Sequence, residues 1–95
     1  MTQFSFKFEA AILQTKMAEH LTKLRADRQL TMRELAGTLN ESHSFISKIE
    51  KQNRRVSVGE FIHYCRALGH DPAKELDKFM RANTIAEIPV ICGAD

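Results

Sequence analysis

TMRELAGTLNESHSFISKIE, residues 31–50, is the stretch that decides the fold. It opens with Thr31 and Glu34 in a T-x-x-E capping box, in which each of the two side chains satisfies a backbone N–H at a helix start. Three apolar residues then share one helical face, namely Leu35, Ala36 and Leu39. The pattern predicts a short amphipathic helix that begins at about Met32.

A tight turn and a second short helix complete the stretch. Asn40 tolerates the left-handed backbone conformation that such a turn requires, and Ser42 can cap the helix that follows. In that second helix Ile46 and Ile49 point inward, while the polar residues around them point elsewhere. Two helices joined in this way form a helix-turn-helix, a unit whose second helix lies in the DNA major groove.

Helical periodicity predicts further helices on both sides of this unit. One runs from Glu9 to about Arg28, with an apolar face of Leu13, Met17, Leu21 and Leu24. Another runs from Val58 to Leu68 and ends at Gly69, and its buried face is predicted to hold Val58, Phe61, Ile62, Cys65 and Leu68. A last helix begins at Asp71–Pro72, carries Leu76, Phe79 and Met80, and fades near Asn83.

The two ends of the chain have a different pattern. Residues 1–8 alternate with a period of two, which places Phe4, Phe6 and Phe8 on one side of a predicted strand. Residues 84–95 include Ile88, Val90 and Ile91, which favour a second strand. We therefore expect an N-terminal extension over 1–8, a helical domain over 9–83 and a tail over 84–95. Each strand would need a partner for its backbone, and frayed tails are the alternative.

From about Met17 to Leu76 the chain resembles the lambda-repressor/Cro-like (XRE-type) DNA-binding family. Four features in order carry the resemblance: LRADRQLTMRELAGTLN at 24–40, S-x-I-x-K-I-E at 44–50, the basic loop KQNRR at 51–55, and VSVGEFIHYCRALGHDPAKEL at 56–76. The turn departs from the family, because Asn40–Glu41 replaces the usual glycine and the apolar residue that wedges between the two helices. The resemblance implies a mainly α fold of five helices with possible short terminal strands.

The resemblance also places the DNA contacts. It implies base contacts from the start and outer face of the second helix of the unit, for which the candidates are Ser42, His43, Ser44, Ser47 and Lys48. The basic loop would hold DNA phosphates through Lys51, Asn53, Arg54 and Arg55. Arg25 and Glu50 are implied to form a partly buried ion pair with an architectural role. Phe45 could cover the core or meet a thymine methyl group, and packing is the interpretation that we favour.

Composition sets limits without deciding the function. The chain has 95 residues and a net charge of +2, which is mild for a nucleic-acid binder. Its four histidines are dispersed, its two cysteines form no C-x-x-C, and no glycine-rich phosphate loop is present, so we expect no enzyme, no metal and no cofactor. The sequence shows no secretory signal pattern and no membrane-spanning stretch, which favours a cytoplasmic protein.

Together these patterns predict a sequence-specific transcriptional regulator, a Cro-type repressor that binds a palindromic operator in double-stranded DNA as a homodimer. The alternative is a protein-interaction module, such as an antitoxin that binds a toxin. The two hypotheses differ in their salt dependence, since only DNA binding releases condensed counterions steeply.

Overall fold

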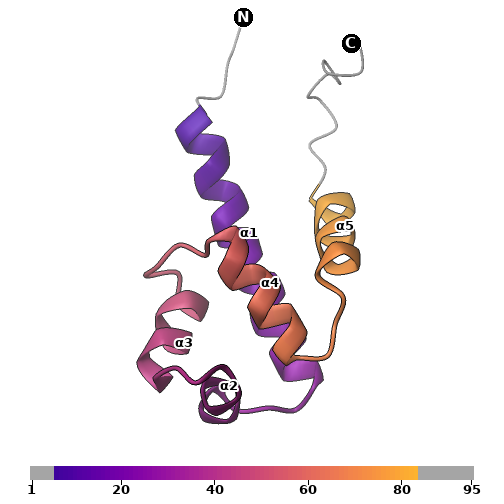
Figure 1. Ribbon diagram of the computed structural model, residues 1–95. Coiled ribbons are helices and arrows are strands. Elements are labelled where there is room, and N and C mark those ends of the chain that lie inside the picture. Colours follow the sequence, from indigo (N-terminus) through magenta and orange to yellow (C-terminus); the bar gives the residue numbers. More distant parts are fainter. Residues whose placement is uncertain (1–5, 84–95) are drawn as a thin grey trace, which may run out of the picture.

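The computed structural model describes residues 6–83, which form five helices (Figure 1). They are α1 (Phe6–Asp27), α2 (Met32–Leu39), α3 (His43–Glu50), α4 (Val58–Ala67) and α5 (Pro72–Ala82). Helix α1 runs the length of the molecule, with α2 and α3 at its C-terminal end, α4 across its middle and α5 to one side. The helix-turn-helix predicted from the sequence is therefore α2 and α3.

Local sequence sets where most helices begin. Thr31 and Ser57 head complete capping boxes with Glu34 and Glu60, and Ser42 accepts a hydrogen bond from the backbone N–H of Phe45. In α5, Asp71 caps the helix and Pro72 occupies its first turn. Each of these side chains satisfies an N–H that a helix start would leave without a partner.

Four helices end in the same backbone motif, in which the chain passes through the left-handed region. Gln29, Asn40, Gln52 and Gly69 have φ between 58° and 79°. At the α2–α3 turn the N–H of Asn40 donates to the carbonyl of Gly37 at 3.1 Å, and that of Glu41 donates to Ala36 at 2.8 Å. This pair of bonds is a Schellman motif, and it fixes the angle between the two helices of the unit.

A single core joins α1 to α4. Its fully buried members are Leu21, Leu35, Ile46, Ile49, Tyr64, Cys65 and Leu68. Helix α3 packs mainly on α2 and α1, while α4 packs mainly on α2 and α5. Because Ile46 and Ile49 point into this core, the remaining surface of α3 is left for the solvent side.

Helix α5 is attached partly through a buried carboxylate. Glu75 is only 3% exposed, and its oxygens lie 3.1 Å from Nε2 of His20 on α1, 3.4 Å from Nδ1 of His70 and 3.4 Å from Nζ of Lys78. The ring of His20 also meets Phe79 edge-on, with the ring centroids 5.7 Å apart. A buried carboxylate requires such partners, because an ion without them would be costly to remove from water.

Three expectations from the sequence were wrong. Residues 6–8 are helical rather than part of a strand, and the side chain of Phe6 is 85% exposed. A helix satisfies its backbone hydrogen bonds within itself, whereas a strand there would need a partner. Val58, expected on the buried face of α4, is 76% exposed, and Leu13 is also exposed. The other residues of the two predicted terminal strands, among them Phe4, Ile88, Val90 and Ile91, lie outside the described residues.

Candidate nucleic-acid interface

Helix α3 has one polar face. Ser42, His43, Ser44 and Lys48 are exposed, and Ser47 is partly exposed. The opposite face holds Ile46 and Ile49, both completely buried. Ile46 and Ile49 thus fix the rotation of the helix, so all five candidate base-contacting residues lie at its start or on its outward face. Hydroxyl, imidazole and ammonium groups offer hydrogen bonds of the kinds that read base edges.

The cap of α3 limits what Ser42 can do. Its Oγ accepts from the backbone N–H of Phe45 at 3.1 Å, which satisfies one N–H of the first turn. The hydroxyl hydrogen remains available as a donor. Ser42 is therefore suited to donate to a phosphate or to a base acceptor, while it continues to cap the helix.

The α2–α3 turn carries an exposed acid where the related family places an apolar wedge. Glu41 is exposed, and its N–H closes the Schellman motif at Ala36. A hollow of about 320 Å³ lies beside it, lined by Leu39, Glu41, Phe45, Gly59, Glu60, His63 and Tyr64. The packing that an apolar turn residue would supply at this position is therefore missing.

The side chains of the basic loop after α3 are in two different situations. Lys51, Asn53 and Arg55 are exposed. Arg54 is exposed as well, but its guanidinium already has partners in the protein: its Nη1 and Nη2 donate to the carboxylate oxygens of Glu60 at 2.8 and 2.7 Å. Its Cζ also lies 4.7 Å from the centre of the Phe45 ring. The sequence did not predict the pairing of Arg54 with Glu60, and phosphate contact by residues of this loop stays a prediction.

The loop is tied to α1 at its other end. The backbone N–H of Val56 donates to Oε1 of Gln14 at 3.1 Å. Arg55 lines a hollow together with Phe6, Lys7, Ala10 and Ala11 of α1. The loop is thus held both by α4, through Glu60, and by α1, through Gln14, so its exposed cations have a fixed support.

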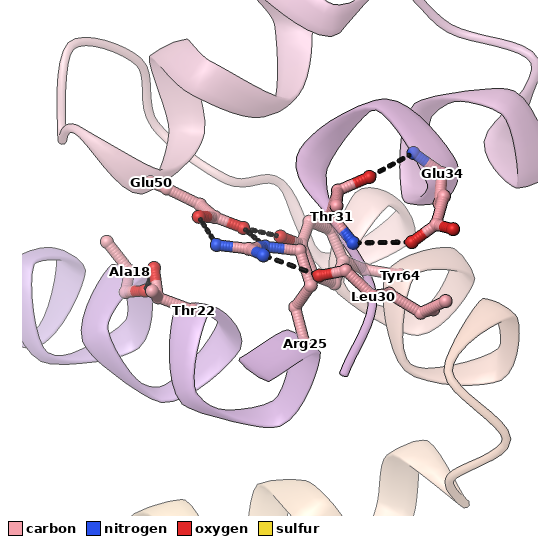
Figure 2. Close-up of polar contacts among 8 residues, drawn as sticks. All are labelled: Ala18, Thr22, Arg25, Leu30, Thr31, Glu34, Glu50 and Tyr64. Atoms are coloured by element: carbon pink, nitrogen blue, oxygen red, sulfur yellow. Dashed lines mark hydrogen bonds and ion pairs between the residues drawn. The ribbon is translucent and has the colours of Figure 1, made fainter. Parts of the chain in front are cut away.

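Arg25 and Glu50 form the ion pair that ties α1 to the end of α3 (Figure 2). Nε of Arg25 donates to Oε2 of Glu50 at 2.7 Å and Nη2 donates to Oε1 at 2.8 Å, in bidentate geometry. Nη1 donates to the carbonyl oxygen of Leu30 at 2.6 Å. The side chains are 15% and 2% exposed, so this pair lies inside the protein and its role is architectural.

Tyr64 is the third member of this network, and it was not predicted from the sequence. Its hydroxyl donates to Oε2 of Glu50 at 2.7 Å, and its side chain is buried in α4 (Figure 2). Burial, and then the bond to Glu50, raise the pKa of Tyr64 well above its ordinary value. The hydrogen bond to Glu50 is also the main reason that the pKa of Arg25 is raised. One buried carboxylate therefore connects α1, α3 and α4.

Glu60 is the other functional residue that sequence reasoning missed. A signal was available, because S-V-G-E at 57–60 has the spacing of a capping box, but nothing marked its pairing with Arg54. Hydrogen bonds from Arg54 and then from the backbone of Ser57 lower the pKa of Glu60 to about 2. The carboxylate is thus ionised at any working pH.

The described part of the chain has neither a cluster of metal ligands nor a membrane-spanning helix. No group of three or more histidine, cysteine, aspartate or glutamate residues between 6 and 83 is arranged to hold a metal ion. Within the same range no helix has the length and apolar character needed to cross a membrane. Cys65 is buried as expected, and burial raises the pKa of its thiol to about 11.

Comparison with solved structures identifies the family. The chain is 32% identical to an XRE-family like protein from Pseudomonas syringae pv. tomato, with a TM-score of 0.76, over 81% of this chain and 94% of that one. The chain belongs to the XRE family. The clp gene regulator ClgR from Corynebacterium glutamicum is 30% identical, with a TM-score of 0.65 and coverage of 74% of each chain.

A third solved structure shares the fold alone. The restriction-modification controller protein C.Esp1396I has a TM-score of 0.67 at 20% identity, over 82% of this chain and 92% of that one. No protein-family model matches the chain, and no curated sequence is similar enough to be matched with it. The family resemblance that the motifs of residues 17–76 indicated is confirmed by the solved structures, as is the five-helix fold with its helix-turn-helix.

Proposed function

We propose that this XRE-family protein is a sequence-specific DNA-binding transcriptional regulator, a repressor of Cro type that inserts α3 into the major groove of a palindromic operator. The observation that carries the proposal is the division of α3 into two faces. Ile46 and Ile49 are buried in the core, and the polar residues opposite them form an exposed row on a helix fixed at both ends. A rigid helix with an outward row of hydrogen-bonding groups is what direct readout of bases requires.

Each residue of the row has a proposed contact. The ammonium group of Lys48 can reach the O6 and N7 acceptors of guanine, and His43 can donate to the same kind of acceptor. The hydroxyls of Ser44 and Ser47 can donate or accept, and Ser42 can donate. Because serine hydroxyls suit several bases, Lys48 is the residue from which we expect the sharpest preference.

The members of the loop other than Arg54 supply affinity without sequence information. Lys51 and Arg55 are the proposed phosphate contacts, with Asn53 between them. Lys7 on α1 lines the same hollow as Arg55, which adds positive charge beside that end of the loop. Each phosphate neutralised should release counterions, so binding should weaken steeply as the salt concentration rises.

We also propose a homodimer, because one recognition helix reads only a few base pairs. The large apolar side chains that are exposed among the described residues all lie on α1, the start of α4 and α5, and none lies on α2 or α3. We base the proposed dimer surface on these exposed apolar side chains. Val58 and Leu76 line one hollow together with Gln14 and Met17 of α1, and Phe6, Ile12 and Leu13 are exposed nearer the start of α1. A second copy would bury part of this surface. Binding to a palindromic operator requires the two copies of α3 to lie about 34 Å apart, one turn of DNA.

The base-reading test compares single substitutions on α3 with a charge-matched control. Lys48→Ala and Ser44→Ala should each weaken binding to a selected operator by about 1–3 kcal/mol and relax the preference at one base pair. Lys74→Ala removes an equal charge from the exposed surface of α5 and should leave the preference intact. If Lys48→Ala and Lys74→Ala behave alike, α3 does not read the operator.

The dimer test uses the full chain. Phe6→Ser together with Leu76→Glu should shift the protein from dimer to monomer in sedimentation, while the helical circular dichroism stays close to that of the parent protein. Affinity for the operator should fall as the dimer is lost. A variant that remains dimeric at micromolar concentration would place the interface elsewhere.

A further inference from the structure

The sequence predicts that Arg54 holds a phosphate, but all three of its described hydrogen bonds are to other groups of the protein. Its Nη1 and Nη2 form a bidentate pair with Glu60, and Nη1 also donates to the carbonyl oxygen of Arg55 at 3.1 Å. The side chains of Arg54 and Glu60 are 37% and 28% exposed. The two Nη atoms of Arg54 therefore bind the two oxygens of a carboxylate. An arginine binds two oxygens of a phosphate in the same bidentate geometry.

The same guanidinium lies over an aromatic ring of the recognition helix. Its Cζ is 4.7 Å from the centre of the Phe45 ring, within the range of a cation–π contact. Phe45 belongs to α3 and Glu60 to α4. One side chain in the loop therefore touches the helix that would read the DNA and, at the same time, the start of the next helix.

Glu60 is itself fixed to the start of α4. Its Oε1 accepts from the backbone N–H of Ser57 at 3.0 Å, and the Oγ of Ser57 accepts from the backbone N–H of Glu60 at 3.1 Å. This capping box holds the carboxylate in place when it receives Arg54. The connection from Phe45 through Arg54 to Glu60 thus ends on a rigid part of the fold.

The neighbouring packing gives a reason for this connection. Helix α3 packs mainly on α2 and α1 rather than on α4. The hollow beside Glu41 separates the α2–α3 turn from the start of α4, and a Cβ added at Gly59 would meet nothing within 4 Å. Tyr64 connects the end of α3 to α4 through Glu50, and the contact through Arg54 adds a second connection between the two helices on the Phe45 side of α3.

We propose that Arg54 is a positioning residue, which holds the recognition helix at a fixed angle to α4 through Phe45 and Glu60 and does not contact phosphate in the complex. This inference rests on the proposed DNA-binding function. A phosphate brought to the Nη1–Nη2 fork would displace the carboxylate of Glu60 and leave that carboxylate close to the DNA backbone. A positioning role predicts that Arg54 affects the discrimination between sequences, whereas a phosphate contact affects all sequences alike.

The test measures binding to a selected operator and to random duplex DNA over a range of salt concentrations. For Arg54→Ala we expect the ratio of the two affinities to fall roughly three- to tenfold, the scale of one exposed cation–π contact and one exposed ion pair. The slope of log affinity against log salt should not change. Arg55→Ala is the matched control: it should weaken both DNAs equally and reduce the slope by about one unit.

Three further variants separate the two roles while keeping the positive charge at position 54. Glu60→Gln and Phe45→Leu leave Arg54 in place but remove its partners, and Arg54→Lys keeps the charge without the planar fork. The positioning role predicts that all three lose discrimination as Arg54→Ala does, at an unchanged salt slope. Thermal unfolding followed by circular dichroism checks that each variant is folded under the binding conditions.

Opposite results would overturn the inference. A slope reduced by one unit in Arg54→Ala, with equal losses on both DNAs, would make Arg54 a phosphate contact. Tighter binding with a steeper slope in Glu60→Gln would mean that Glu60 holds Arg54 away from the DNA. If the parent protein binds operator and random DNA equally well, the proposed function is wrong. That result comes from the parent protein alone, so it is distinguishable from a failure of the inference about Arg54.

Discussion

Replacing Arg25 with alanine should cost more stability than any other single change of charge among the described residues. The substitution strands the carboxylate of Glu50, which is 2% exposed and would keep only the hydroxyl of Tyr64 as a side-chain partner. Breaking a buried ion pair by removing one partner costs about 3–5 kcal/mol. The carbonyl oxygen of Leu30 also loses its donor. Helix α1 would then be held to the end of α3 by apolar packing alone.

The magnitude is large for a chain of this size. A protein of 95 residues has a stability of about 5–14 kcal/mol on average scaling. A loss of 3 kcal/mol would lower the melting temperature by at least about 12 °C, since each kcal/mol corresponds to roughly 4–8 °C in a small domain. Tyr64→Phe removes one hydrogen bond to the same carboxylate and should cost less, about 1.5–3 kcal/mol.

Urea unfolding followed by helical circular dichroism measures both variants. Arg81→Ala, in the exposed pair with Asp77, is the control and should leave the midpoint close to that of the parent protein. Arg25→Met combined with Glu50→Leu should recover part of the loss, because no charge is left stranded. The reasoning is refuted if Arg25→Ala costs less than about 1 kcal/mol or if the double variant is the less stable of the two.

Three further measurements test particular residues. The pKa of Glu60, about 2, lies below the ordinary 4.5, so its stabilising contribution is complete above pH 4.5 and is lost as the pH falls towards 2. A carboxyl titration by NMR should show this low pKa, and Arg54→Ala should raise it again. The sequence has a second cysteine, Cys92, and Cys92→Ser leaves Cys65 as the one thiol. Cys65 should then resist thiol reagents at neutral pH until the protein unfolds, because it is buried and its pKa is about 11. Rapid labelling of the folded protein would contradict its burial. Gln52 has a φ of 66°, so Gln52→Gly should raise the unfolding midpoint slightly, and a lower midpoint would show that its side chain matters more than backbone strain.

The helix-turn-helix could be predicted from the sequence because its signals are local. The capping box of Thr31 with Glu34, the left-handed Asn40 and the cap at Ser42 all act within a few residues, and each is present in the structure. The buried isoleucines of α3 follow from helical periodicity in the same way. Such short-range rules do not depend on how the rest of the chain packs.

The ends of the helical domain could not be predicted so well, because periodicity over a few residues is ambiguous. Three phenylalanines at alternate positions fit a strand, but Phe6 and Phe8 lie in the first turns of α1. Val58 has the helical spacing of a core residue yet is exposed at the first position of α4, where the neighbouring helix leaves it uncovered. Exposure at a helix end depends on tertiary packing rather than on spacing.

Only part of the polar contacts that connect the helices could be predicted from the sequence. Arg25 and Glu50 followed from the family resemblance, whereas Tyr64 and the pairing of Arg54 with Glu60 depend on which side chains meet across the fold. A basic residue in a loop after a recognition helix suggests a phosphate contact, and nothing local tells Arg54 from Arg55. Only the position of α4 separates the two.

Selection of bound sites from random duplex DNA tests the central claim most directly. The account predicts one enriched motif with two-fold symmetry, whose half-sites lie about 34 Å apart, and loss of the preference at one base pair in each half-site when Lys48→Ala is selected in parallel. If the parent protein enriches no sequence, or if Lys48→Ala selects an identical motif, then α3 is not a recognition helix and the proposed function is wrong.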